Sequence, residues 1–321
     1  MEDEHARLVR EAVSSDQAGR STLAASWCRS ALHHGLDPAR GPAADRLDAS
    51  RLALARGARE DLIRHAGPVL DRIAGTLVRS GRCILLTDAE SLILEERMTD
   101  GDRDVFDRAR LVSGECWSEA AEGTNGIGTC LADEKPVAIH RDQHFLSANV
   151  QVSCHGVPIY DAGGSLVGAL DVSTNRYDHD RDTAALIMNV LAGAASELER
   201  LLFGAAYQNC RIVHLDDGCG AGGGDAGACG GALVAVDRDD LVIGANRSAR
   251  RRGALAGVSA TTPVPIADIL GAQDEDPLAA AERRALRQAL ARSRGNVAAA
   301  ARDLGIGRAT FYRRMARAGL D

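Results

Sequence analysis

Lysine is almost absent from this sequence: Lys135 is its single lysine, although lysine and arginine together number 38. A phosphate-binding loop of the GxxxxGK[ST] type needs a lysine after a glycine, and Lys135 follows a glutamate, so such a loop is excluded. The sequence also lacks the run of about 18 apolar residues that a membrane-spanning helix needs. Its first residues, MEDEHARLVREAV, lack the apolar centre of a signal peptide, so we expect a cytoplasmic protein.

Cysteine pairs of the CxxC type are missing as well. The chain has eight cysteines, and they are scattered along its length. In a cytosolic protein such residues are read as thiols rather than as a disulfide framework, and structural zinc sites need more closely spaced ligands. We therefore expect no metal and no other cofactor. The positions are Cys28, Cys83, Cys116, Cys130, Cys154, Cys210, Cys219 and Cys229.

Charge is distributed unevenly between the two ends of the chain. Residues 280–321 hold ten arginines and three acidic residues, a net charge of +7, whereas the whole chain carries −7. The preceding residues therefore carry −14. An acidic body with a basic tail suggests an end that binds nucleic acid, although a solvated helix or a membrane-surface patch has the same composition.

The first two thirds of the chain have the pattern of an α+β domain. Residues 51–80 carry apolar side chains at steps of three and four, which predicts a helix, and 181–203 do the same over a longer span. Between them lie short apolar stretches, and the turn 161–164 joins the last two as a hairpin. Antiparallel strands flanked by helices indicate a sensor-like domain. The predicted strands are 83–88, 92–94, 136–139, 156–160 and 166–172.

A glycine-rich stretch, 217–231, separates this domain from the remainder of the chain and predicts a linker. Residues 232–237 and 241–246 then predict two strands joined by a turn. The segment that contains them is short, so it predicts only a small or degenerate domain.

The C-terminal end predicts three helices separated by breaks that contain glycine. Phe311 and Met315 lie one turn apart and are expected to be buried. A basic helix that crosses a short helix through a glycine turn is the helix-turn-helix arrangement, whose second helix enters the DNA major groove. The opposite face of the last helix carries Arg308, Thr310, Arg313, Arg314 and Arg317. The predicted helices are 278–293, 297–304 and 308–318.

This end resembles the Fis-type helix-turn-helix of bacterial enhancer-binding regulators. The matching residues are Gly295-Asn296, Ala299-Ala300, Leu304-Gly305-Ile306 and Arg308-x-Thr310-x-Tyr312-Arg313, followed by Gly319-Leu320. The resemblance implies that Arg308 reads bases. Gly307 stands where the family often has Ser or Asn, which weakens the cap of the last helix. The implied DNA-binding residues are Asn296, Arg308, Thr310, Tyr312, Arg313 and Arg314.

The N-terminal part resembles the GAF-containing regulators of the acetoin-catabolism type. The matching residues are Ser26-Trp27-x-Arg29, Gly35-Leu36-Asp37-Pro38, Trp117-Ser118-Glu119, Gly123-Thr124-Asn125-Gly126-Ile127-Gly128-Thr129, Gln143-His144-Phe145, Pro158-Ile159-x-Asp161 and Leu166-Val167-Gly168-x-Leu170-Asp171-Val172-Ser173. Residues 232–251 resemble the PAS-like strand pair that follows GAF in these regulators. The resemblance implies a pocket for a small organic effector, closed by Trp117, His144, Phe145 and Cys154.

The two resemblances together divide the chain into five parts. They are a helical segment (1–50), a GAF-like sensor domain with flanking helices (51–205), a linker (206–231), a degenerate PAS-like segment (232–276) and the helix-turn-helix (277–321). Relatives with a central ATPase carry a phosphate loop and a GAFTGA element, and this chain has neither. We therefore expect a ligand-responsive regulator that binds double-stranded DNA without ATP hydrolysis. A homodimer is expected, because such proteins usually read two half-sites.

Several alternatives compete with this interpretation. The Gly123–Thr129 stretch suggests a nucleotide loop, but its spacing favours a helix start. His140 and His144 could hold a metal or haem, and Cys116, Cys130 and Cys154 could sense oxidants. An enzyme that reduces methionine sulfoxide with paired cysteines would use the same fold but would leave the helix-turn-helix unexplained. A dimerisation adaptor would lack sequence-specific DNA binding.

Overall fold

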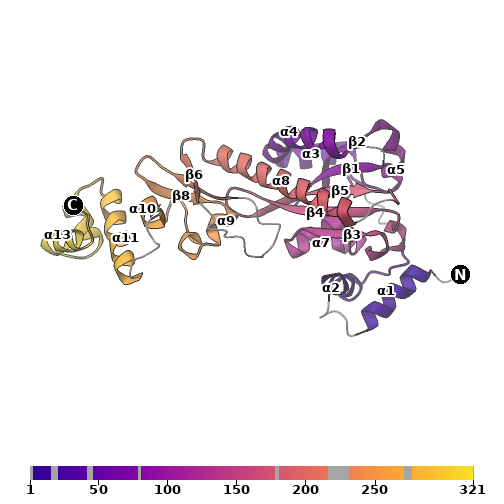
Figure 1. Ribbon diagram of the computed structural model, residues 1–321, viewed down its shortest axis with the longest axis horizontal. Coiled ribbons are helices and arrows are strands. Elements are labelled where there is room, and N and C mark those ends of the chain that lie inside the picture. The colour runs from indigo at the N-terminus through magenta and orange to yellow at the C-terminus, as the bar shows by residue number, and fades with distance from the viewer. Residues whose placement is uncertain are drawn as a thin grey trace. The chain divides into compact units, whose positions relative to one another are not determined.

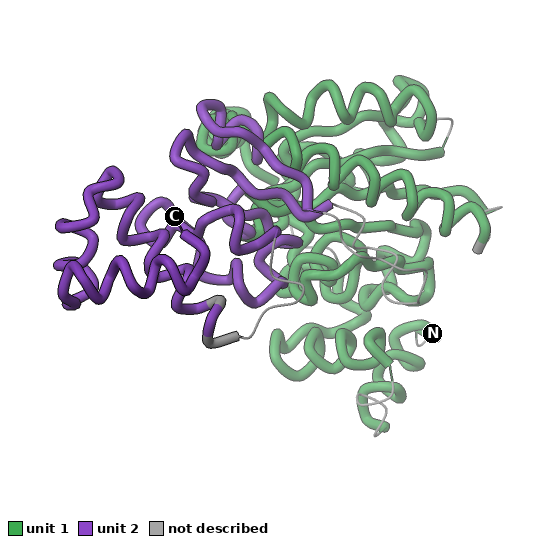
Figure 2. The backbone as a smooth tube through the Cα atoms, turned by 60° about the vertical axis from the view of Figure 1, so that its left-hand side comes forward, with its two compact units in different colours: residues 1–161, 165–202, 225–230 green, residues 162–164, 203–224, 231–321 purple. Residues whose placement is uncertain are grey.

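The chain divides into two compact units (Figure 2). Unit 1 contains residues up to 161 together with 165–202, and unit 2 contains 162–164 and most of the chain from residue 203 onward. The computed structural model describes residues 3–15, 21–41, 46–78, 81–177, 181–215, 231–270 and 277–320.

An antiparallel sheet of five strands forms the centre of unit 1, in the order β2-β1-β5-β4-β3 (Figure 1). Strands β4 and β5 form the hairpin that the turn at 161–164 predicted, with Tyr160 opposite Leu166. The predicted strands are confirmed, although β2 and β4 are longer than expected because their outer residues pair with neighbours that sequence patterns do not reveal. The bounds are β1 (Arg82–Asp88), β2 (Ile93–Met98), β3 (Val137–His140), β4 (Ser153–Tyr160) and β5 (Leu166–Thr174).

Two long helices, α4 (Glu60–Leu77) and α8 (Arg181–Ala206), contribute the apolar core on one face of the sheet. Leu70 and Ile73 of α4 are fully buried there with Leu86 and Leu170 of the central strands. The single helix predicted over 51–80 is wrong in one respect. It is divided into α3 (Ala49–Ala58) and α4, because Arg59 leaves helical geometry between them.

Short helices contribute the core on the other face: α5 (Arg103–Arg108), α6 (Glu119–Glu122) and α7 (Gly126–Asp133). Helix α7 begins after Asn125, whose side chain accepts hydrogen bonds from the amides of Ile127 and Gly128. The prediction of a helix start at Gly123–Thr129 is therefore confirmed. Three further short helices complete this region: η2 (Asp100–Asp102), η3 (Arg141–Gln143) and η4 (Ser147–Asn149).

The N-terminal helices α1 (Glu4–Ser14), α2 (Thr22–Cys28) and η1 (Arg29–His33) pack on unit 1 as part of the same body. Val9 and Leu36 share an apolar cluster with Phe145 and Leu146. Shortly after the end of η1, Gly35 adopts a positive φ of 66°, a conformation that favours glycine.

Unit 2 begins with a second antiparallel sheet, in the order β6-β7-β8-β9. The two strands predicted over 232–237 and 241–246 are confirmed as β7 and β8. The linker predicted over 206–231 is wrong at residues 211–215, which pair with β7 as strand β6, whereas residues 216–230 lie outside the described part. The bounds are β6 (Arg211–Leu215), β7 (Ala232–Val236), β8 (Leu241–Ala245) and β9 (Val264–Pro265).

The helices of unit 2 lie between β8 and β9 and after β9 in sequence. Short helices cover the sheet, and three longer ones form the C-terminal end. No helix among the described residues is both long and apolar enough to cross a membrane. The bounds are α9 (Arg247–Arg250), η5 (Gly253–Leu255), α10 (Ile266–Leu270), α11 (Pro277–Arg292), α12 (Val297–Asp303) and α13 (Arg308–Arg317).

Candidate functional site

Helices α11, α12 and α13, residues 277–320, form a reading head with its own apolar core. Phe311 is fully buried with Leu286, Ala300 and Ala301. The small alanine side chains allow α12 and its neighbours to cross closely. Gly305 has a positive φ of 65°, which lets the chain turn sharply between α12 and α13. The structure therefore confirms the helix-turn-helix.

Helix α13 presents four of the predicted DNA-binding residues to solvent, and Arg314 is one of them. Arg308 and Arg313 are exposed, and the ring of Tyr312 is 48% exposed. The guanidinium carbon of Arg308 lies 5.7 Å from the centre of that ring. A cation above an aromatic ring at this distance is weakly attracted to it, which restricts the arginine at the start of the helix. Thr310, half-buried, lies one turn before Arg314 on the same helix.

The two caps of the helix-turn-helix differ. Asn296 accepts hydrogen bonds from the amides of Ala298 and Ala299, at 3.1 and 3.2 Å, and so caps α12. Its carboxamide oxygen is engaged in this cap. Gly307 precedes α13 and provides no side-chain cap, as the sequence implied.

An acidic residue of α11 pairs with the arginines at the end of α13. Glu282 contacts Arg317 at 2.5 Å and the Nε atom of Arg314 at 3.5 Å. The structure therefore places the predicted residue Arg314 in an internal ion pair, whereas Arg308 and Arg313 have no acidic partner among the described residues.

The first helix of the reading head is anchored to the segment that precedes it in the chain. Asp268 of α10, with 5% of its side chain exposed, contacts Arg287 at 2.8 Å and Arg284 at 3.7 Å. One turn along, the Gln288 amide donates a hydrogen bond to the Pro263 carbonyl at 2.6 Å. These three residues of α11 form one stripe, because they are spaced at i, i+3 and i+4.

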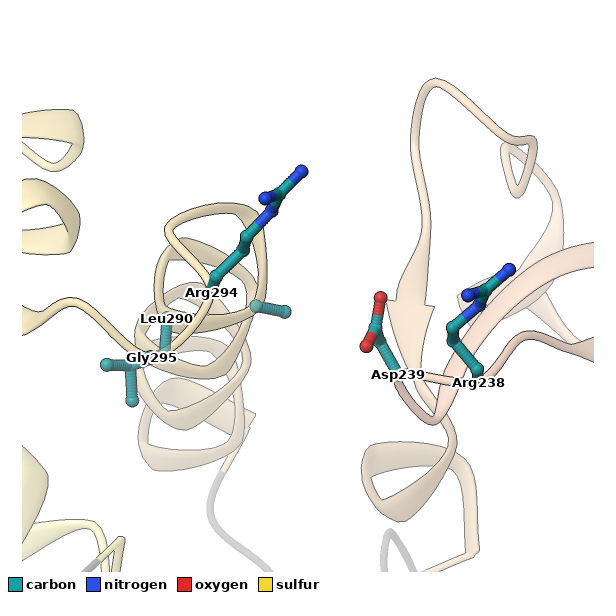
Figure 3. A pocket seen from close by; sticks show the side chains of 6 residues that line it. Arg238, Asp239, Leu290, Arg294 and Gly295 are labelled. Atoms are coloured by element: carbon teal, nitrogen blue, oxygen red, sulfur yellow. The ribbon is translucent and has the colours of Figure 1, made fainter.

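Beyond this stripe, α11 and the sheet of unit 2 separate and leave a hollow of about 760 Å³ (Figure 3). Arg238 and Asp239, in the turn between β7 and β8, lie on one side of it, and Leu290, Arg294 and Gly295 lie on the other. The sequence analysis did not identify this feature, because its two walls are far apart along the chain.

The four residues predicted to close an effector pocket do not form a single group. His144 and Cys154 contact each other, with 3.4 Å between Nε2 and Sγ. Trp117 belongs to the apolar cluster that also contains Cys154, and its Nε1 atom donates a hydrogen bond to the Arg110 carbonyl. Phe145 belongs to the cluster beneath the N-terminal helices. All four side chains are buried.

A buried polar cluster continues from His144 and Cys154 into the centre of the sheet. The Ser173 hydroxyl lies 3.1 Å from the Cys154 sulfur and donates to Asp171 at 2.6 Å. The other oxygen of Asp171 is buried without a hydrogen-bond partner. Burial raises the pKa of Asp171 to about 7, lowers the pKa of His144 to about 4 and raises the pKa of the Cys154 thiol. The cluster is therefore largely uncharged between about pH 4 and pH 7.

Sequence reasoning did not assign Asp171 and Ser173 to a site, although both belong to the matched motif. Their signal was alternation along β5. Leu170 and Val172 are apolar and face the helices α4 and α8, so Asp171 and Ser173, which alternate with them, must face the opposite core. Polar residues at both of these positions mark the buried cluster.

A second buried group unites three of the matched motifs. The Glu119 carboxylate accepts hydrogen bonds from Arg29, from the Ser26 hydroxyl at 2.6 Å and from the Thr129 hydroxyl at 2.7 Å. Burial opposes ionisation of Glu119, but these hydrogen bonds outweigh burial and lower its pKa. The group fastens the N-terminal helices to α6 and α7.

No group of three or more histidine, cysteine or acidic side chains is arranged for metal binding within the described ranges. His140 lies 5.7 Å from His155 between ring centres. The Nδ1 atom of His144 instead lies 3.0 Å from the Arg141 carbonyl.

Comparison with known families and proteins identifies both ends of the chain. Residues 5–200 match the MimR N-terminal domain, and residues 277–317 match the Fis family of bacterial regulatory proteins. Residues 201–276 separate the two matches. In structure, the chain is similar to the crystallised complex of Escherichia coli DhaR(N) with DhaL, with a TM-score of 0.53, 13% identity and coverage of 72% of this chain and 75% of that one.

Curated relatives are regulators of transcription. The acetoin catabolism regulatory protein of Cupriavidus necator is 28% identical over 65% of this chain and 31% of its own length. AcoR, the acetoin dehydrogenase operon activator of Bacillus subtilis, is 31% identical over 52% of this chain and 27% of its own length. MimR, the propane 2-monooxygenase operon activator of Mycolicibacterium smegmatis, is 30% identical over 43% of this chain and 23% of its own length. The matched part therefore spans about a third or less of each of these relatives.

Proposed function

The chain belongs to the family defined by the MimR N-terminal domain, and from this premise we propose that it is a sequence-specific DNA-binding regulator of transcription controlled by a small organic effector. The observation that carries the proposal is the exposed face of α13, where Arg308 and Arg313 stand free of acidic partners among the described residues. A helix of this kind fits the major groove, and arginine is the side chain that most often reads guanine there.

The DNA contacts proposed are those of the reading head. Arg308, at the first turn of α13, is placed to reach base edges, and its neighbours reach the backbone or adjacent bases. The proposed set is Asn296, Arg308, Thr310, Tyr312, Arg313 and Arg314. A homodimer would present two such heads to two half-sites.

The proposed mode of action does not use ATP hydrolysis. Only residues 201–276 lie between the two family matches, and their described part forms the small sheet of unit 2 and its short helices. The only lysine, Lys135, lies outside that stretch. Effector binding would instead change the affinity or spacing of the reading heads.

The effector is proposed to be a small neutral oxygenated compound. The relatives are named for acetoin catabolism and for the propane 2-monooxygenase operon, and both names refer to small organic molecules. Among the residues expected to sense it, His144 and Cys154 are the two that touch. Trp117 and Phe145 are proposed as further walls of this site.

The alternative of a thiol enzyme has less support. Burial raises the pKa values of Cys83, Cys130 and Cys154, so these thiols are poor nucleophiles. A catalytic cysteine needs the opposite surroundings, with partial exposure and a nearby positive charge.

The test is binding of the purified chain to its own upstream DNA and to random DNA, measured by fluorescence anisotropy in a salt series. The double variant R308A/R313A should lose the preference for the upstream DNA, whereas the control R64A/R103A removes two exposed arginines from unit 1 and should keep it. Equal affinity of wild type for both DNAs would overturn the proposal. Acetoin is the first effector to add, with a change in affinity or footprint as the expected result.

A further inference from the structure

The reading head contains a negative charge beside the surface proposed to meet DNA. Glu282 is the only acidic residue of α11, and 25% of its side chain is exposed. It contacts Arg314 at 3.5 Å and Arg317 at 2.5 Å. The two arginines lie one turn apart on α13, and 46% and 71% of their side chains are exposed.

The arginines of α13 therefore fall into two pairs with different surroundings. Arg308 and Arg313 have no acidic partner in the part of the chain that the structure describes, whereas Arg314 and Arg317 share one carboxylate. DNA phosphates can bind the same guanidinium groups, because arginine forms a bidentate contact with a phosphate much as it does with a carboxylate. Both partners of the pair reach solvent, so a phosphate has access to them.

We infer that the Glu282 carboxylate competes with DNA phosphates for Arg314 and Arg317, an inference that rests on the proposed DNA binding. It lowers the affinity of the head for DNA of any sequence and leaves base reading to Arg308 and its neighbours. Backbone contacts carry no sequence information, so their suppression keeps the protein from being held on random DNA.

The inference is tested by the salt dependence of binding to random and upstream DNA by E282Q, in which the carboxylate becomes a neutral amide of the same shape. Each phosphate contact steepens the salt dependence by a slope of about 0.9, so two released arginines add roughly 1.8. Between about 50 and 200 mM salt, E282Q should lose roughly ten times more affinity than wild type. At the lower salt concentration it should bind both DNAs more tightly.

The matched control is D303N, which makes the same change in net charge at an exposed residue of α12. Asp303 has no basic partner within the described ranges, so D303N should change the slope little. The double variant E282Q/R314A should lose about half of the added slope, because one of the two released arginines is gone.

An E282Q slope equal to that of wild type, or a D303N slope as steep as that of E282Q, would overturn the inference. Either result is distinct from failure of the proposed function. If the proposed function were wrong, wild-type protein would show no preference for upstream DNA, whatever the slope of E282Q. Equal thermal midpoints of wild type and E282Q would confirm that the head is folded in both.

Discussion

The carboxylate of Glu119 and the guanidinium of Arg29 form a two-point contact, with 2.5 Å between Oε2 and Nε and 2.8 Å between Oε1 and Nη2. Only 4% of the Glu119 side chain is exposed. The contact joins the N-terminal helices to the core of unit 1, so the segment before the sheet is part of the structure of unit 1.

Replacement of Arg29 should therefore destabilise unit 1. R29A leaves a buried carboxylate without its charged partner, which costs about 3 kcal/mol of unfolding free energy. Both tryptophans of the chain, Trp27 and Trp117, lie in unit 1, so their fluorescence in urea follows its unfolding. The control R10A breaks an exposed pair with Asp37 and should cost less than about 1 kcal/mol. Equal losses in the two variants would contradict the prediction.

Asp171 should make the stability of unit 1 depend on pH. Its pKa is raised to about 7 by burial, from an ordinary value of 3.8. Between these values the folded state keeps a proton that the unfolded state has released, so stability falls as pH rises, by up to about 1.4 kcal/mol per pH unit. His144 has the opposite effect on stability. Burial lowers its pKa to about 4 from an ordinary 6.5, so its contribution to the stability of unit 1 falls as pH drops below 6.5.

D171N removes the first effect and leaves the second. The unfolding free energy of D171N relative to wild type should therefore rise between about pH 4 and pH 7, by up to about 1.4 kcal/mol per unit. The measurement is urea unfolding at several pH values, with D104N, at an exposed residue of unit 1, as the control. Parallel curves for D171N and wild type would show that Asp171 titrates normally.

Gly126 should tolerate no side chain. An added Cβ would lie 2.4 Å from the Cβ of Cys154 and 2.9 Å from a carboxylate oxygen of Asp171. G126A should cost about 3 kcal/mol, because α7 must then lift from β4. G193A in α8 meets nothing within 4 Å and should stabilise by up to about 1 kcal/mol, since alanine favours helices. The urea midpoint followed by tryptophan fluorescence should fall in G126A and rise in G193A. Equal shifts in the two variants would refute the packing argument.

Asn296 should matter through its cap of α12. N296A removes the hydrogen bonds to Ala298 and Ala299 and should cost about 1 kcal/mol locally, whereas N296D keeps an acceptor and should cost less. Hydrogen exchange of the peptide that covers α12 measures this directly. Unchanged exchange in N296A would mean that the cap contributes nothing.

Asp268 of α10 should hold α11 to the segment that precedes it in the chain. D268A leaves Arg284 and Arg287 without their shared carboxylate, so amide exchange in the middle of α11 should rise by about tenfold, equivalent to about 1.4 kcal/mol. D239A, in the exposed turn between β7 and β8, is the control. Equal exchange in wild type and D268A would show that the helix is held by its other contacts.

Much of the local structure was accessible from sequence because it depends on neighbouring residues. The Asn296 cap, the helix start after Asn125 and the hairpin at 161–164 are all decided within a few positions. The strand β6 was missed, since its five residues lie just before the glycine-rich stretch and its partner β7 lies beyond that stretch.

The sequence by itself therefore determined the strands of the first sheet, its long helices in outline, and that the C-terminal end is a basic helix-turn-helix. Only the tertiary structure decided which side chains meet. It paired Arg29 with Glu119 and Glu282 with Arg317, and it separated Trp117 and Phe145 into different clusters. The physical reason is that periodicity sets the buried face of each element locally, whereas contacts between elements depend on register and packing across the whole unit.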